Sequence, residues 1–279
     1  MQFRPFGTTG QQISALGFGA MRLPMRWRHK KGHVTMREAV RLIRHAFERG
    51  VNYVDTAYGY CEGESEIAVG KALKGWRDRV MLSTKLPIWA VKKRADFRRL
   101  LEEQLRKLQV ECIDFYHLHG IGEARMRDVV LKYHLLDEAE KAKRRGEIRH
   151  LSFSFHDKPD AMKAIVDTGA FASVLCQYNL LDRANEDAMA YAKSKGLGVI
   201  VMGPVGGGRL GAPSKVIQKL LPRKAASSAE IALRFVLSNP SVDCALSGMS
   251  ALEHVDENVT VAANAAPLSA AEHARIRAA

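Results

Sequence analysis

Short apolar runs alternate with longer segments of helical period along almost the whole chain. The runs are rich in Val, Ile, Leu and Phe, which is typical of strands buried in a parallel sheet with helices between them. Eight such units within 279 residues predict one (β/α)8 (TIM) barrel of the α/β class over residues 1–279. The strands are expected near residues 14–19, 53–55, 80–85, 113–119, 148–154, 173–178, 198–202 and 243–247. The clearest helical segments are residues 35–48, 95–108, 124–145, 158–167, 183–195, 228–238 and 251–262.

Local signals refine some of these boundaries. Thr35, with Glu38 three residues later, has the spacing of a capping box. Ser228 is expected to cap the helix that follows it. Residues 203–225 carry five glycines and show no period, and an irregular segment of that length in a compact domain is usually functional.

The composition limits the cellular setting. The N-terminus lacks the apolar stretch of a signal peptide, and no run of about eighteen apolar residues follows. The four cysteines are widely spaced, without a metal-ligand pattern. We therefore expect a soluble cytoplasmic protein that has no membrane partner, no metal and cysteines kept as thiols.

The net charge of +13 raises the possibility of nucleic-acid binding. However, the Lys and Arg residues concentrate at helical spacing, which is typical of the solvated faces of amphipathic helices. No recognisable nucleic-acid motif accompanies them. We expect no nucleic-acid partner, and nucleic-acid binding is the weakest of the alternative functions.

Four ionisable residues fall at or just after the ends of successive predicted strands: Asp55, Tyr60, Lys85 and His119. The C-terminal ends of the strands form the active-site face of such a barrel, so these side chains should converge. An ammonium beside a phenol makes it a stronger acid. Tyr60 could then protonate a carbonyl oxygen, with a neutral His119 orienting that oxygen. We expect His117, in the same strand, to face the outer helices.

Each of these residues alone has a structural explanation. Asp55 could terminate a turn, Tyr60 could be a rim aromatic, and a lysine at a strand end is more often solvated than buried. Their joint occurrence at matching strand ends favours a site. A proton donor aimed at a carbonyl group also needs a source of hydride.

The sequence resembles the aldo-keto reductase superfamily along nearly the whole chain, and three segments carry the resemblance most clearly. They are Asp55-Thr56-Ala57 with Tyr60, Ser83-Thr84-Lys85, and Asp114-Phe115-Tyr116-His117-Leu118-His119. The resemblance implies an aldo-keto reductase-like barrel that reduces a small-molecule aldehyde or ketone to an alcohol with NAD(P)H. It also implies that Asp55, Tyr60, Lys85 and His119 form the catalytic tetrad, with Tyr60 as the general acid.

The resemblance extends to a cofactor site for NADPH or NADH, with NADPH slightly favoured. It implies that Ser154 and Gln177 hold the nicotinamide carboxamide and that Met202 covers the ring where many members have an aromatic residue. Gly248 and His254 lie where members that grip a 2′-phosphate often carry Lys and Arg. The full expected set is Ser154, Gln177, Met202, Gly203, Pro204, Gly206, Gly207, Gly208, Leu210, Gly248, Ser250, His254, Glu257 and Asn258. Trp27 and Trp89 lie in loops where the family builds its substrate pocket, and either could line it or merely pack at the rim.

The run Tyr58-Gly59-Tyr60-Cys61-Glu62-Gly63-Glu64-Ser65-Glu66 resembles a bacterial and archaeal branch whose members often continue into a C-terminal iron–sulfur segment. The cysteines of such a segment do not occur in this sequence, so a shorter natural form or a truncated chain is expected. Two alternative functions follow. The chain could be a non-catalytic nucleotide-binding barrel that binds a protein partner, or the barrel part of a larger iron–sulfur redox protein. The sequence does not predict the oligomeric state.

Overall fold

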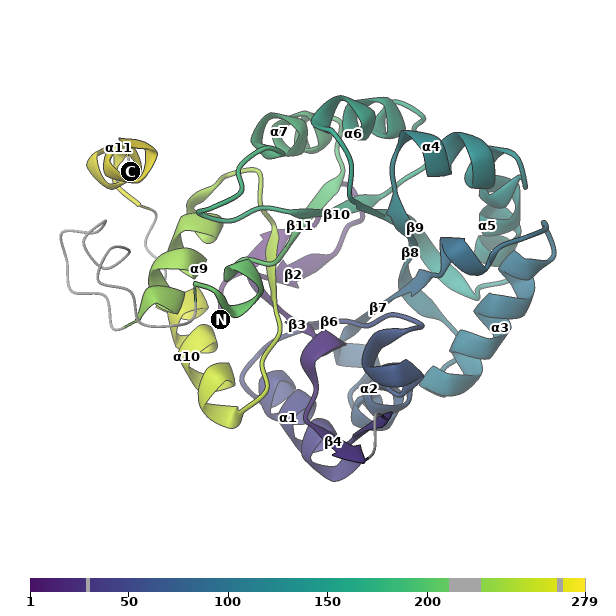
Figure 1. Ribbon diagram of the computed structural model, residues 1–279, viewed down its shortest axis with the longest axis horizontal. Coiled ribbons are helices and arrows are strands. Elements are labelled where there is room, and N and C mark those ends of the chain that lie inside the picture. Colours follow the sequence, from purple (N-terminus) through teal and green to yellow (C-terminus); the bar gives the residue numbers. More distant parts are fainter. Residues whose placement is uncertain (29–30, 211–226, 265–267, 279) are drawn as a thin grey trace.

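Eight parallel strands form a closed barrel in the computed structural model, which describes residues 1–28, 31–210, 227–264 and 268–278 (Figure 1). Their order around the barrel is β10-β11-β12-β3-β6-β7-β8-β9. The predicted (β/α)8 fold is therefore confirmed. The strands are β3 (Leu16–Gly19), β6 (Tyr53–Asp55), β7 (Met81–Leu86), β8 (Ile113–Ile121), β9 (Ile148–Phe155), β10 (Ser173–Gln177), β11 (Gly198–Met202) and β12 (Cys244–Ser247).

Helices surround the strands and bury one face against them, as α1 does with Leu42, Ile43 and Ala46 (Figure 1). No described helix is both long and apolar enough to cross a lipid bilayer. The main helices are α1 (Met36–Glu48), α2 (Ser65–Leu73), α3 (Asp96–Leu108), α5 (Leu135–Arg144), α6 (Pro159–Val166), α7 (Glu186–Ser194), α9 (Ser228–Ser238), α10 (Leu252–Asn264) and α11 (Ala270–Ala278).

Two helical regions differ from the sequence prediction. The helix expected over residues 124–145 is interrupted: α4 (Glu123–Arg125) continues into a π-helical turn, Met126–Leu131, and α5 starts after His134, whose φ is 53°. The helix α2 was missing from the predicted set. Because most of its residues are buried, its sequence lacks the polar face that marks an amphipathic helix.

Helix starts and strands also differ locally. The Thr35 side chain makes no capping hydrogen bond. Ser227, not Ser228, caps α9, because its hydroxyl accepts from the Glu230 N–H at 3.0 Å. The sequence predicts a loop after β3, but this part of the chain forms the antiparallel strands β4 (Met25–Arg28) and β5 (Lys31–Val34).

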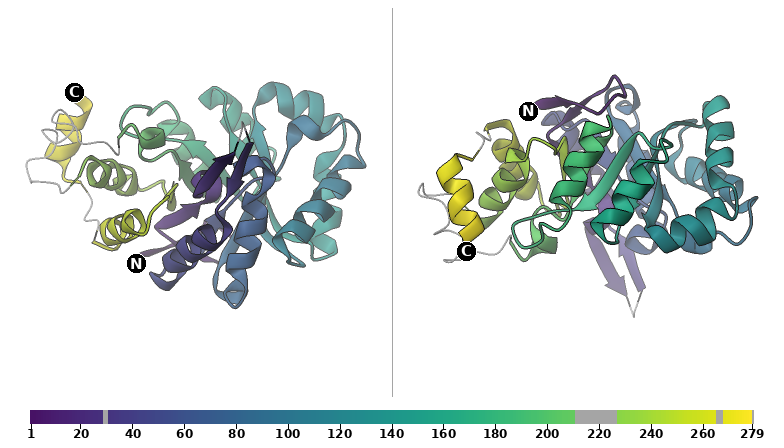
Figure 2. Two further views of the ribbon diagram at one scale, coloured as in Figure 1. Left: turned by 60° about the horizontal axis from the view of Figure 1, so that its bottom comes forward. Right: turned by 90° about the horizontal axis from the view of Figure 1, so that it is seen from above.

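An N-terminal hairpin of β1 (Phe3–Pro5) and β2 (Gln12–Ser14) closes the end of the barrel where the strands begin. Phe6, between these strands, is fully buried, with ring centroids 6.2 Å from Tyr53 and 4.8 Å from Phe115. A Cβ on Gly198 would lie 2.2 Å from the Phe6 ring, so only glycine fits there. Figure 2 shows this hairpin and the β4–β5 hairpin at opposite ends of the barrel. An active site is therefore expected at the other end of the barrel, at the C-terminal ends of the strands.

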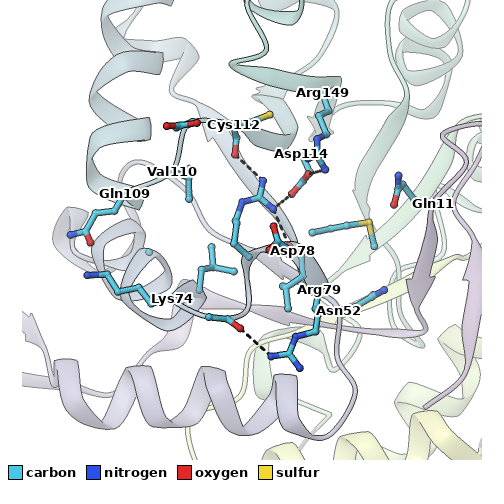
Figure 3. Close-up of a pocket in the computed structure, with 17 residues that line it drawn as sticks. Gln11, Asn52, Lys74, Asp78, Arg79, Gln109, Val110, Cys112, Asp114 and Arg149 are labelled. Atoms are coloured by element: carbon cyan, nitrogen blue, oxygen red, sulfur yellow. Dashed lines mark hydrogen bonds and ion pairs between the residues drawn. The ribbon is translucent and has the colours of Figure 1, made fainter.

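A cavity of about 550 Å³ lies at the N-terminal ends of the strands, away from the predicted site (Figure 3). At its centre the buried Asp114 carboxylate is 2.7 Å from Arg77 and 2.6 Å from Arg149, and it accepts the Leu82 N–H at 2.8 Å. Arg77 also donates to the Cys112 carbonyl at 2.8 Å. These bonds tie the starts of β7, β8 and β9 together, so we interpret this end of the barrel as structural.

Replacing Asp114 by Ala should lower the free energy of unfolding by about 1–3 kcal/mol, because it leaves the buried Leu82 N–H without its acceptor and removes the counter-charge of Arg77. Arg149→Met is the matched control. Its side chain is 60% exposed, so its loss should cost less than about 1 kcal/mol. Urea unfolding measures both, and equal losses would contradict the structural role of Asp114.

Candidate active site

Asp55 and Lys85 form a buried ion pair at the C-terminal ends of neighbouring strands. Asp55 ends β6, and Lys85 lies one residue before the end of the parallel β7. The Lys85 ammonium is 2.5 Å from Asp55 Oδ2 and donates to the Thr56 carbonyl at 2.7 Å. Ser83 Oγ donates to the other carboxylate oxygen at 2.9 Å. Both charged side chains are buried from solvent.

The Lys85 ammonium keeps its proton in this setting. Burial alone disfavours the charged form, but Asp55 and Tyr60 outweigh it and raise the pKa of Lys85 above its ordinary value. A buried ion pair needs its remaining donors and acceptors bonded, and Thr56 and Ser83 provide those bonds. The site therefore holds a fixed positive charge at neutral pH.

Tyr60 begins a tight turn, Tyr60–Gly63, in the loop after β6. The next two residues, Cys61 and Glu62, have φ 51° and 56°, a left-handed conformation that costs side chains other than glycine roughly 1 kcal/mol or more. Lys85 Nζ lies 4.8 Å from the centroid of the Tyr60 ring. The His119 ring meets the phenol edge-on, with centroids 6.2 Å apart. Tyr60 thus lies next to both the ammonium and the imidazole.

Hydrogen bonds hold the Tyr60 turn against the 3-10 turn Ala20–Arg22. Ser65 Oγ donates to the Ala20 carbonyl at 2.7 Å, and the Thr56 hydroxyl lies 2.7 Å from Ser65 Oγ. Cys61 Sγ donates to the Met21 carbonyl at 3.5 Å. Burial raises the pKa of Cys61, so this thiol resists ionisation and contributes to packing.

His119 presents a neutral imidazole near the end of β8. Burial and the nearby Lys85 ammonium lower the pKa of His119 to about 3. Its Nδ1 is buried and has no hydrogen-bond partner among the described residues, and its ring lies 4.9 Å from that of Trp89. A neutral imidazole has one N–H and one acceptor nitrogen, so His119 can donate a hydrogen bond without carrying a charge.

The predicted orientation of His117 toward the outer helices is wrong. Its Nε2 lies 3.4 Å from the Tyr53 hydroxyl, and both side chains are buried. Tyr53 belongs to the apolar cluster inside the barrel. Residues two apart on a strand point to the same side, so His117 and His119 both face inward. His117 forms the layer below the site.

Ser154, Gln177 and Met202 lie at the ends of three adjacent strands, β9 to β11, and Gln177 is in register with Met202. Ser154 Oγ accepts the Gly120 N–H at 2.7 Å, which ties β9 to β8 beside the site. A Cβ on Gly203 would lie 2.7 Å from Gln177 Oε1, so the glycine leaves room for this amide. The structure brings the three predicted residues to one edge of the barrel mouth.

The chain after β11 forms a glycine-rich turn, Gly206–Gly208. All three glycines have positive φ, a conformation that glycine adopts without steric cost. Pro204 and Leu210 are buried beneath the turn, whereas Gly207 and Gly208 are exposed. Gly206 and Gly208 donate their N–H groups to the Gly203 and Val205 carbonyls. The absence of side chains on the exposed glycines lets a phosphate approach this backbone closely.

Arg22 lies between this turn and the segment after β12. Its Nη2 is 3.7 Å from the position of a Cβ on Gly207, and its side-chain carbons are 3.5 to 3.6 Å from that on Gly248. A guanidinium beside exposed glycines is suited to an anion such as phosphate. Arg22 is not predicted from the sequence, because one arginine in a basic chain carries no distinguishing mark.

The predicted adenosine-binding segment divides into buried and exposed residues. Asn258 donates to Ser247 Oγ at 3.2 Å inside the protein, and Glu257 accepts a hydrogen bond from Ser227 Oγ. These two residues of α10 therefore support the end of β12 and the start of α9. The exposed members are Gly248, Ser250 and His254.

The two candidate tryptophans differ in their surroundings. Trp89 is 49% exposed and packs against His119, as a pocket wall requires. Trp27 is 65% exposed on β4, and its ring lies 3.2 Å from the position of a Cβ on Gly32 across the hairpin. Of the two tryptophans, only Trp89 contacts a catalytic candidate, His119.

Two more basic side chains beside the site were missed. Arg125 and His156, in the loops after β8 and β9, both contribute to the lowered pKa of His119. Arg125 follows His119 by six residues, which places it on the C-terminal face of the barrel. Its direction depends on the break in the helix predicted over residues 124–145, because α4 ends at Arg125 and a π-helical turn follows.

Comparison with known proteins agrees with this geometry. The sequence model of the Aldo/keto reductase family matches residues 15–279. L-galactose dehydrogenase of Arabidopsis thaliana is 30% identical, over 93% of this chain and 87% of that protein. The holo form of an aldo-keto reductase from Bacillus halodurans superimposes with a TM-score of 0.84 at 30% identity, covering 100% of this chain and 96% of that one. An aldo-keto reductase from Klebsiella pneumoniae in complex with NADPH gives 0.82 at 27% identity, covering 100% and 95%. The chain therefore belongs to the aldo/keto reductase family of oxidoreductases.

Proposed function

We propose that this protein reduces an aldehyde or ketone to an alcohol with NADPH or NADH, and that Tyr60 donates the proton. The observation that supports this most strongly is the Asp55–Lys85 ion pair beside the Tyr60 ring. A fixed ammonium next to a phenol stabilises the phenolate that remains after proton donation. The neutral His119 faces the same phenol.

When bound, NAD(P)H supplies the hydride for the carbonyl carbon. The residues of the chain handle the proton and the oxygen. Tyr60 passes its hydroxyl proton to the carbonyl oxygen while Lys85 stabilises the phenolate. Asp55 holds Lys85 in place and offsets the cost of burying its charge. The His119 N–H donates a hydrogen bond to the same oxygen, and its low pKa keeps it from acting as a competing acid.

Several features of the barrel mouth fit a nicotinamide dinucleotide. Ser154 and Gln177 offer a hydroxyl and an amide to the carboxamide, next to Met202. The exposed glycine-rich turn allows phosphates a close approach, and Arg22 offers them positive charge. Relatives from Klebsiella pneumoniae were solved with NADP and with NADPH. The barrel features fit NADPH and NADH equally, and the relatives support NADPH as the preferred cofactor.

Cofactor titration is the direct test. NADPH and NADH are added separately while the tryptophan fluorescence is followed, and aldehydes and ketones are then screened for cofactor oxidation. We expect tighter binding of NADPH and turnover with at least one carbonyl compound. Absence of binding by either cofactor would contradict the proposal, and binding without any turnover would favour a non-catalytic nucleotide-binding role.

The pH dependence of reduction gives a further prediction. Because burial and Lys85 lower the pKa of His119 to about 3, this residue is almost entirely neutral from about pH 5 upwards. The kcat/KM for reduction should therefore show no histidine inflection between about pH 5 and 8. An inflection in that range that disappears in His119→Asn would contradict the neutral role of His119.

A further inference from the structure

Arg125 lies directly beside the strand end that carries His119. It ends α4, and its Nη1 donates to the Gly120 carbonyl at 2.7 Å. Gly120 follows His119 and has φ +63°, and a Cβ on it would lie 3.0 Å from Arg125 Nη1 and 3.6 Å from His156 Cδ2. Arg125, His156 and Gly120 therefore form a short wall next to the catalytic imidazole.

The charge of Arg125 acts on the site. After burial, Arg125 is the largest influence that lowers the pKa of His156, and it also helps to lower that of His119. His156 is thus biased toward its neutral form. Arg125 is consequently the positive charge of this wall that remains available to a ligand.

Arg125 lacks the acidic partner that a nearby arginine has. Arg127 forms two bonds to the Asp128 carboxylate, at 2.8 and 2.9 Å. Arg125 makes no ion pair with a carboxylate in the described part of the chain. A guanidinium has five N–H donors, and its bond to Gly120 occupies one Nη1 donor. The remaining donors are suited to a carboxylate, which an arginine binds in bidentate fashion.

We infer that the substrate carries a carboxylate as well as the reacting carbonyl, and that Arg125 binds it. The inference rests on the proposed reductase function. Arg125 bonds to the carbonyl of the residue next to His119, and its charge acts on the His119 imidazole. A substrate whose carbonyl oxygen meets Tyr60 and His119 would direct its carboxylate toward this guanidinium. The substrate class is a short oxo acid.

Two substrates with the same spacing between aldehyde and carboxyl carbon test this assignment: 4-oxobutanoate, which has a free carboxylate, and its neutral methyl ester. The kcat/KM of each is measured with NADPH for the wild type, Arg125→Met and Arg127→Met. We expect the wild type to prefer the acid. Arg125→Met should lower kcat/KM for the acid at least about tenfold, the loss of a charge-assisted bidentate contact, and leave the ester almost unchanged. Arg127→Met should change neither.

Three results would overturn the inference. They are equal use of acid and ester by the wild type, an equal loss on both substrates in Arg125→Met, and turnover of 4-nitrobenzaldehyde with no turnover of either test compound. In each case the reductase function itself would stand. Failure to reduce any carbonyl compound despite bound NADPH would instead contradict the proposed function.

Discussion

Tyr60→Phe is expected to lower kcat for carbonyl reduction by a factor of about 10² to 10⁴, the usual contribution of a general acid. The substitution removes one hydroxyl and leaves the ring in its place beside Lys85 and His119. Without that hydroxyl, the carbonyl oxygen has no strong proton donor, because His119 is neutral and Lys85 is engaged by Asp55. Cofactor affinity should not change.

A second tyrosine in the same loop gives a matched control. The Tyr58 hydroxyl donates to Glu103 at 3.2 Å, so it is directed to α3 and away from the ion pair. Tyr58→Phe removes the same group two residues away and should keep nearly full turnover. Initial rates with saturating NADPH measure both variants. Full activity in Tyr60→Phe would disprove its role as the acid, and equal losses in both variants would indicate a structural effect of the loop.

The catalytic candidates could be predicted because the fold determines where they lie. Asp55, Lys85 and His119 belong to consecutive neighbouring strands, and parallel strands in a closed barrel end on one face. Recognising the strands was therefore enough to bring these side chains together. Tyr60 follows from the same argument, since a loop of few residues cannot carry it far from Asp55.

The positions of the strands do not predict the conformations of the loops. The break before α5 depends on the left-handed His134, and no glycine marks that position. Arg22 and Arg125 become candidate site residues only through their contacts with Gly207 and Gly120 in other parts of the loops. Sequence spacing does not show these contacts. The wrong prediction that His117 faces the outer helices does not come from the strand, which is assigned correctly. Residues two apart in a strand point to the same side, so His117 had to face inward with His119.

Lys85→Met should reduce kcat by about two orders of magnitude or more, and it should also weaken the fold. Without the ammonium, Tyr60 is a weaker acid, because its phenolate loses the adjacent positive charge. The Asp55 carboxylate would stay buried without its counter-charge, at a cost of about 3–5 kcal/mol. Activity and urea unfolding must therefore be measured together.

A double variant separates these two effects. Asp55→Asn combined with Lys85→Met removes both charges, and the new amide can still accept the hydrogen bond from Ser83. Removing both charges avoids leaving one buried charge without its partner, so the double variant should regain part of the lost stability. Its turnover should stay as low as that of Lys85→Met, because the phenol still lacks the ammonium. If turnover recovered along with stability, Lys85 would serve only the fold, and the electrostatic activation of Tyr60 would be wrong.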